Sequence, residues 1–140
     1  MAIDKTLLSQ KLAQLEEYIQ DVNALKNKPR EEYIRRHPTE DLAERRLEKA
    51  VQCAIDIASY IVTREAMGNP GQYRDLFHFL GREGITDAAL TERLEKMAGF
   101  RNILIHEYSY IEEELVYDAV QKGINDLILF SQAIKKKFIG

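Results

Sequence analysis

The sequence predicts an all-α fold, an up-and-down bundle of four main helices with one short additional helix. Apolar residues recur at alternating steps of four and three over most of the chain, the period of a helix that buries one face. No segment shows the alternation of a strand, and the 7 glycines and 3 prolines cluster in stretches that look like connections. We expect residues 1–140 to form a single domain, because a core of this size holds together without disulfides.

The first half of the chain predicts two long helices. Pro29 and Pro38 bracket the polar connection between them, which holds a short helical turn at Glu31 to Arg36. Thr39 is the predicted N-cap of the second helix, and the acidic residues after it suit the positive end of the helix dipole. The two apolar stripes define helices from Ile3 to about Lys26 (Leu8, Leu12, Leu15, Ile19, Val22) and from Leu42 to about Ala66 (Leu47, Ala50, Val51, Ala54, Ile55, Ala58, Ile61, Val62).

The second half predicts a short helix and two longer ones after the break at residues 67–71 (MGNPG). The acids at 112–114 and the lysines at 135–137 complement the dipole of the last helix. The predicted helices run from Tyr73 to near Gly84, from Thr86 toward Tyr108, and from about Glu112 to Phe138.

Composition excludes several classes of protein. The net charge of −3 argues against a protein that coats nucleic acid by bulk electrostatics, and the basic clusters at 26–36 and 135–137 are interpreted as solvated faces. No apolar run approaches the roughly 20 residues that cross a bilayer, so we expect no membrane association. A single cysteine, Cys53, excludes an internal disulfide framework and suits a reducing compartment. We therefore expect a cytoplasmic protein.

Arg101 interrupts the apolar stripe of the fourth helix. The stripe runs through Leu90, Leu94 and Met97, and its next positions are Arg101, Leu104 and Tyr108. An arginine on a packing stripe is costly unless its five donors find partners or the stripe faces a pocket or another chain. One interpretation is that Arg101 snorkels or pairs with a carboxylate of a neighbouring helix. The other is that it belongs to a functional site.

Asn102 and His106 lie on the helix line next to that of Arg101 and Tyr108. At about 100° per residue, Arg101 and His106 diverge by about 140° on a straight helix, so the two share one phosphate with difficulty. The difficulty is removed if the helix loosens near Gly99 or past Ile105, or if a two-fold partner brings its own copy across a shared groove. We favour the homodimer.

The residue types at these positions suit metal-independent cleavage of RNA, in which the ribose 2′-OH attacks its own phosphodiester. A histidine exchanges a proton near neutral pH. The arginine supplies a permanent forked charge that matches phosphate oxygens, and Asn102 can orient a ligand or the histidine. The three histidines are scattered and no carboxylates cluster with them, so we expect neither a metal site nor a cofactor.

Four runs of sequence resemble the HepT-like family of HEPN domains, and together they cover about residues 40–120. The most specific is an Arg-x4-His-x-Tyr motif with a polar residue after the arginine, present here as Arg101, Asn102, His106 and Tyr108. The runs are residues 44–50 (ERRLEKA), 54–58 (AIDIA), 73–77 (YRDLF) before the break at Gly84-Ile85, and 97–108 (MAGFRNILIHEY).

That resemblance implies a HEPN-like bundle and the toxin of a type VII-like toxin–antitoxin module. Arg101 and His106 would be the catalytic pair of a metal-independent endoribonuclease, with Asn102 supporting them. The implied partner is a minimal nucleotidyltransferase antitoxin that adds AMP to Tyr108, which places negative charge and bulk at the groove. Tyr110 is the competing acceptor, but it lies off the Arg101 line if the helix continues.

Two other hypotheses stay open at this point. In one, the chain is an inactive dimeric scaffold or nucleotide-binding module that docks a nucleotidyltransferase. In the other, it is a structural dimer whose Arg101 is merely ion-paired.

Four further side chains are predicted to play structural parts. Cys53 is predicted to be a small, partly buried residue. His78 is expected at the surface, and Gln52 and Asp56 follow the polar face of the second helix, exposed or in an interhelical bond.

Overall fold

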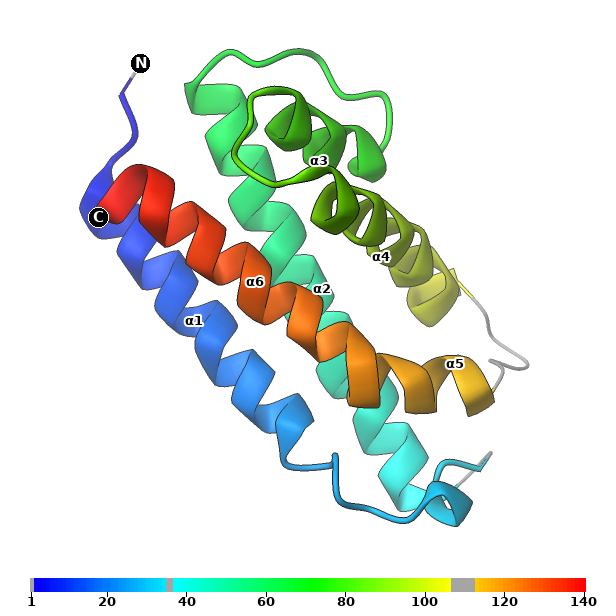
Figure 1. Cartoon of the computed structure of the whole chain (residues 1–140). Coiled ribbons are helices and arrows are strands. Elements are labelled where there is room, and N and C mark those ends of the chain that lie inside the picture. The colour runs from blue at the N-terminus through cyan, green and yellow to red at the C-terminus, as the bar shows by residue number, and fades with distance from the viewer. Residues whose placement is uncertain (1, 35–36, 107–112) are drawn as a thin grey trace.

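The chain folds as a helical bundle in which no strand occurs among the described residues (Figure 1). This computed structural model describes residues 2–34, 37–106 and 113–140. Helix α1 (Lys5–Asn23) packs against α2 (Pro38–Arg64), and α6 (Ile124–Ile134) packs against both. The pair α3 (Tyr73–Arg82) and α4 (Ala88–His106) packs against α2 (Figure 1). The all-α prediction is confirmed.

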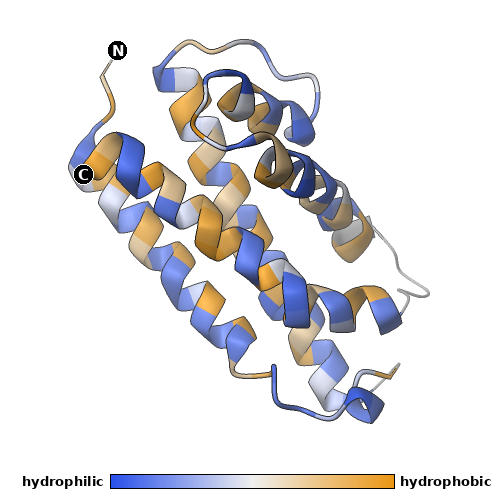
Figure 2. Cartoon of the chain, viewed as in Figure 1, coloured by the Kyte–Doolittle hydropathy of each residue, from blue (hydrophilic) through white to orange (hydrophobic). Residues whose placement is uncertain are grey.

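Helix α1 forms where the stripe predicts it, although it is shorter than expected at both ends. Asp4 caps its start, since its Oδ1 accepts a hydrogen bond from the Leu7 N–H at 3.1 Å. The five stripe residues are all buried, and Figure 2 shows that the polar residues of the bundle lie mainly on its outer surface. The short helical turn predicted at Glu31 to Arg36 is present as a 3-10 turn, η1 (Arg30–Glu32), which begins one residue earlier; residues 35–36 lie outside the described residues.

The predicted N-cap of α2 was wrong. The cap is His37, whose Nδ1 accepts from the Thr39 N–H at 3.1 Å, and Pro38 occupies the first helical position, where a missing N–H has no cost. Thr39 is instead buried inside the first turn, and its hydroxyl donates to Glu32 Oε1 at 2.7 Å. Helix α2 therefore begins four residues before the predicted Leu42.

Helices α3 and α4 approach each other closely at the corner between them. A Cβ added at Gly81 would lie 2.5 Å from Thr91 Oγ1, so only glycine permits this approach. The Thr86 and Thr91 hydroxyls are buried and lie 2.7 Å apart. Asp87, and not Thr86, caps α4, because its Oδ1 accepts from the Leu90 N–H at 2.7 Å.

The C-terminal segment is not one uniform α-helix as predicted. It consists of α5 (Glu113–Asp118), a π-helical turn η2 (Ala119–Gly123), α6, and a π-helical end η3 (Lys135–Ile139). The buried positions Val116, Val120 and Ile124 are spaced by four, and each such step drifts about 40° around an ideal α-helix. The wider π turn absorbs that drift and keeps the three side chains on the core.

The core joins all the helices. Phe77 of α3 meets Phe130 of α6 edge to face, with ring centroids 5.7 Å apart. Tyr33, from the connection, is 1% exposed and donates its hydroxyl to the Leu25 carbonyl. None of the described helices has a stretch long and apolar enough to cross a membrane.

Candidate functional site

Arg101 lies near the end of α4 and contacts side chains from two other helices. Its Nε donates to Oε1 of Gln52 on α2 at 2.9 Å. Its Cζ lies 4.9 Å from the ring centroid of Tyr73, the first residue of α3. The side chain is half-buried, as expected for a residue on the packing stripe. Among described residues no carboxylate forms a salt bridge with Arg101, so the interpretation as an interhelical ion pair is not supported.

The helix does not loosen at Gly99. Helix α4 continues through this position to His106, so that way of bringing Arg101 and His106 together is wrong. The alternatives of a change past Ile105 and of a second protomer remain. On the straight helix the backbone positions of Arg101 and His106 diverge by about 140°.

Of the predicted site residues, the structure brings Asn102 to Arg101. Asn102 is exposed, and its Oδ1 accepts from Arg101 Nη1 at 3.3 Å. His106 is the last residue of α4, and its side chain lies outside the part of the chain that the structure describes. Tyr108 and Tyr110 also lie outside the described residues.

The polar face of α2 contributes a residue that sequence reasoning left without a role. Gln52 makes the interhelical bond that was one of its two expected alternatives, and its Nε2 donates to Asp56 Oδ1 at 2.9 Å. Tyr73, predicted as the start of a helix, is 41% exposed and its ring stacks on Arg101. Neither contact has a local sequence signal, since Gln52 and Arg101 are 49 positions apart.

Two grooves border this part of α2. One, of about 360 Å³, lies between α1 and α2 and is lined by Gln52 together with Lys11 and Lys49. The other, of about 290 Å³, is apolar and lies between α2, α4 and the C-terminal segment, with Met97 and Phe100 in its wall. Gln52 therefore lies between Arg101 and the first groove.

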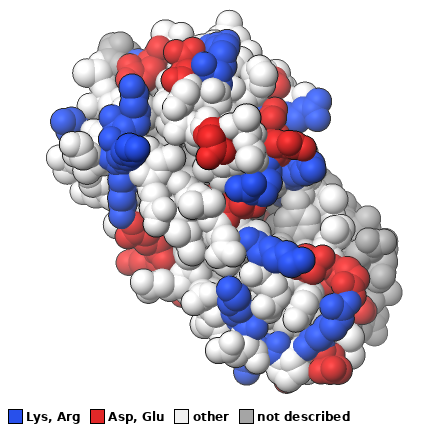
Figure 3. Space-filling view, in the orientation of Figure 1, with Lys and Arg blue, Asp and Glu red and all other residues white. Residues whose placement is uncertain are grey.

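The surface charges are mostly interspersed, as the net charge suggests. Figure 3 shows lysines and arginines beside aspartates and glutamates on the face in view. The two basic clusters are partly paired: Arg30 forms a salt bridge with Glu114, and Lys135 forms one with Glu16. These contacts agree with their interpretation as solvated faces.

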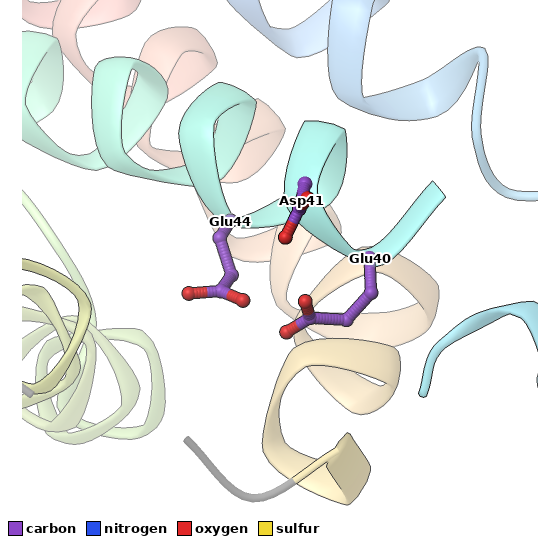
Figure 4. Close-up of side chains that lie close together, drawn as sticks. All are labelled: Glu40, Asp41 and Glu44. Carbon is purple, nitrogen blue, oxygen red and sulfur yellow. The ribbon is translucent and has the colours of Figure 1, made fainter. Parts of the chain in front are cut away.

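A group of three acidic residues at the start of α2 was not predicted. The carboxylate oxygens of Glu40, Asp41 and Glu44 lie within 4.8 Å of one another (Figure 4). Glu40 is only 3% exposed, and this burial, with hydrogen bonding and repulsion from Glu44 and Asp41, raises its pKa to about 8. Carboxylates at this separation can share a proton or a hard cation such as Mg²⁺. With its pKa raised to about 8, Glu40 carries a proton near neutral pH that the group can share.

The other side chains set aside earlier occupy structural positions. Burial is the main reason that the pKa of Cys53 is raised to about 11, so the thiol stays protonated near neutral pH and is a poor nucleophile. His78 is exposed, as predicted, and its Nδ1 lies 3.9 Å from Glu95 Oε1.

Comparison with known sequences identifies similar ribonucleases. A family model described as Ribonuclease HepT-like matches residues 9–134. An mRNA nuclease HepT of Shewanella oneidensis is 33% identical over 89 residues, which are 64% of this chain and 67% of that protein. A tRNA nuclease HepT of Aphanizomenon flos-aquae is 24% identical over 137 residues, 98% of this chain and 93% of that protein.

Solved structures share the fold. The tri-AMPylated HEPN toxin of Shewanella oneidensis in complex with MNT antitoxin matches with a TM-score of 0.83 and 25% identity, over 96% of this chain and 99% of that one. A cytosolic protein of unknown function, YutE from Bacillus subtilis, matches with a TM-score of 0.80 and 18% identity, over 96% and 90%. The predicted HEPN-like architecture is confirmed.

Proposed function

The chain belongs to the HepT-like ribonuclease family, as its motif suggested, and we propose that it is the toxin of a type VII-like toxin–antitoxin module that cleaves RNA without a metal. The observation that carries the proposal is the environment of Arg101. Arg101 lies on α4, the helix that ends at His106, and its guanidinium is held by two neutral side chains of other helices, Gln52 and Tyr73. A cation held this way keeps its charge for a phosphate.

In the proposed reaction the ribose 2′-oxygen forms a bond to phosphorus, and the bond from phosphorus to the 5′-oxygen breaks. His106 takes the proton of the 2′-OH, and a proton is delivered to the leaving 5′-oxygen. Arg101 stabilises the negative charge on the phosphorane, and Asn102 supports Arg101 through its amide oxygen. The products are a 2′,3′-cyclic phosphate and a 5′-hydroxyl, so protons balance and no oxidant or metal is needed.

We propose a homodimer as the active form. Because Arg101 and His106 diverge on a straight α4, two protomers facing each other would bring one protomer's arginine near the other's histidine. Two histidines in one groove would also supply both the base and the acid of the reaction.

The proposed partner is a minimal nucleotidyltransferase antitoxin that adds AMP to Tyr108. The similar Shewanella oneidensis toxin is tri-AMPylated and in complex with MNT antitoxin, which supports the pairing. Each added AMP brings negative charge next to the motif and repels the RNA phosphate. We propose a cytoplasmic location as well, because RNA and ATP, the substrates of the proposed pair, are present there.

The test of the nuclease is cleavage in a chelator. The purified chain is incubated with bulk tRNA and with an mRNA transcript in excess EDTA, and the ends of the products are identified. We expect 2′,3′-cyclic phosphate ends, loss of cleavage in His106→Ala, and unchanged cleavage in His78→Ala, the matched control at an exposed histidine. Cleavage by His106→Ala at the wild-type rate would refute the proposal. An inactive wild-type chain that still binds the nucleotidyltransferase would favour the scaffold.

The proposed addition of AMP to Tyr108 is tested by mass spectrometry of the intact protein. The chain is co-expressed with a minimal nucleotidyltransferase, the proposed partner, and its mass is measured for added AMP. We expect AMP on the wild type and on Tyr110→Phe, and none on Tyr108→Phe. The reverse pattern would move the acceptor to Tyr110.

A further inference from the structure

We propose that Gln52 and Tyr73 are positioning residues that hold the Arg101 guanidinium while leaving its charge available to an RNA phosphate. This inference rests on the proposed function, since that function makes Arg101 catalytic. It adds two residues from other helices, neither of them part of the Arg-x4-His-x-Tyr motif.

The orientation of the Gln52 amide is fixed by Asp56. A side-chain amide can present either its oxygen or its nitrogen, and a carboxylate near neutral pH only accepts hydrogen bonds. Because Gln52 Nε2 donates to Asp56 Oδ1 at 2.9 Å, the amide oxygen must face the other way, toward Arg101. The 2.9 Å bond from Arg101 Nε follows. Asp56 thus sets which end of Gln52 the arginine meets.

Tyr73 supports the guanidinium from α3. The Arg101 Cζ lies 4.9 Å from the Tyr73 ring centroid, within the range of a cation–π contact. The start of α3 is itself fixed, because Asp75 Oδ2 accepts from the N–H groups of Gly71 at 2.9 Å and Gln72 at 3.1 Å. The ring is therefore attached to a capped helix end.

Within the part of the chain that the structure describes, the side chains that contact the Arg101 guanidinium are all neutral. The Gln52 amide oxygen accepts a hydrogen bond from Nε, and the Asn102 amide oxygen accepts a longer one, of 3.3 Å, from Nη1. The Nη nitrogens bind phosphate oxygens in pairs, and among the described residues their one hydrogen bond is the long contact from Nη1 to Asn102, so the hold through Nε leaves these nitrogens largely available to a ligand. A carboxylate at position 52 would also accept from Nε, but it would neutralise the charge. The structure thus combines a firm hold with an available cation.

Two substitutions at position 52 distinguish the positioning of Arg101 from the availability of its charge. Gln52→Leu removes the acceptor, and we expect kcat to fall at least about tenfold with KM changed little, because the charge remains but its placement is lost. Gln52→Glu keeps an acceptor, and we expect KM for tRNA to rise and kcat to fall, because the carboxylate competes with the phosphate. At position 73, Tyr73→Phe keeps the ring and should cleave like the wild type, whereas Tyr73→Leu should resemble Gln52→Leu.

A readout without RNA tests the hold itself. In the 15N-labelled chain the Arg101 Nε–H signal, assigned with Arg101→Lys, should exchange slowly in the wild type and in Gln52→Glu, and rapidly in Gln52→Leu. The Nε–H of Arg93, which bonds Asp126, is the internal control and should not respond to position 52. Thermal melts of each variant show that the fold is kept.

Unchanged exchange in Gln52→Leu, or wild-type kinetics in Gln52→Glu, would overturn the inference. Two other results would reject the proposed function instead. One is a wild-type chain that cleaves neither tRNA nor the mRNA transcript, and the other is an Arg101→Ala variant as active as the wild type. The exchange measurement would still decide whether Gln52 holds Arg101, so the two failures are distinguishable.

Discussion

The two arginines of α4 differ in the charge of the side chains that they contact. Arg93, in the first half of the helix, is exposed and donates from Nε to Asp126 Oδ1 at 2.7 Å, and the carboxylate raises its pKa above the usual range. Arg101, in the second half, donates from the same nitrogen to the amide oxygen of Gln52 and stacks on Tyr73. The same atom makes a similar bond in both cases, but among the described residues only Arg93 has a carboxylate that balances its charge.

The two halves of α4 differ in packing as well. The first half is fixed by the Asp87 cap, the buried Leu94 and the close approach of Thr91 to Gly81. In the second half no described atom lies within 4 Å of a Cβ added at Gly99, and Asn102 and Ile103 are exposed. Both halves contribute to the core, the second through Ala98 and Leu104, but only the first is closely packed at the corner with α3, while the second carries the half-buried Arg101 beside open positions.

The largest expected effect on stability is at the closely packed corner of α4 with α3. Gly81→Ala places a methyl group against the buried and hydrogen-bonded Thr91, so we expect a loss of about 1–3 kcal/mol in the free energy of unfolding. Gly99→Ala is the matched control, and should be neutral or stabilising by up to about 1 kcal/mol, because alanine favours a helix and meets open space. Urea denaturation of both variants measures the difference. Equal effects would break the contrast between the two halves.

A second prediction concerns the buried acid Glu40, which meets burial in a different way from Arg101. Glu40 avoids an unpaired charge by keeping its proton, since its pKa is raised to about 8 mainly by burial. A raised folded-state pKa gives stability that is present below the unfolded pKa of about 4.5 and is lost as the pH rises through about 8. Between pH 5 and pH 9 we therefore expect the free energy of unfolding of the wild type to fall by at least about 1 kcal/mol more than that of Glu40→Gln.

The measurement is urea denaturation at a series of pH values. Glu31→Gln serves as the control at an exposed glutamate outside the group. Identical pH profiles for the wild type and Glu40→Gln would show that Glu40 is ionised in the folded chain, and that the group is held together in another way.

The smallest expected effect is at Arg93. Asp126→Asn removes its neutralising partner but keeps a side chain of similar size. Because the Arg93 side chain is 46% exposed and reaches solvent, although that of Asp126 is only 17% exposed, we expect a small change in thermal stability that shrinks further in high salt, and no change in RNA cleavage. A large loss of cleavage in this variant would mean that the first half of α4 also belongs to the site.

Much of the fold follows from the sequence because the apolar period is a local signal. The stripes of α1 and α2 were predicted residue by residue, and all those positions are buried. Helix ends were less certain, since the cap at His37 competes with Thr39 and the outcome depends on the tertiary bond from Thr39 to Glu32. The π turn at 119–123 also depends on packing rather than on residue type.

The site was predicted in part, for the same reason. Arg101 stands out because it breaks a local stripe, and Asn102 follows from its neighbouring position. Gln52 and Tyr73 could not be found from one sequence, because the bundle alone determines which residues of α2 and α3 face α4. The burial of Glu40 was missed because an acid in a first turn is ordinarily solvated there.

The most direct test of the account is RNA cleavage by two matched variants of α4, Arg101→Ala and Arg93→Ala, in EDTA and at equal protein stability. The account predicts a loss of about 100-fold or more for Arg101→Ala, the scale of removing a charge that stabilises a transition state, and a rate within about twofold of the wild type for Arg93→Ala. Equal rates for the two variants would contradict it.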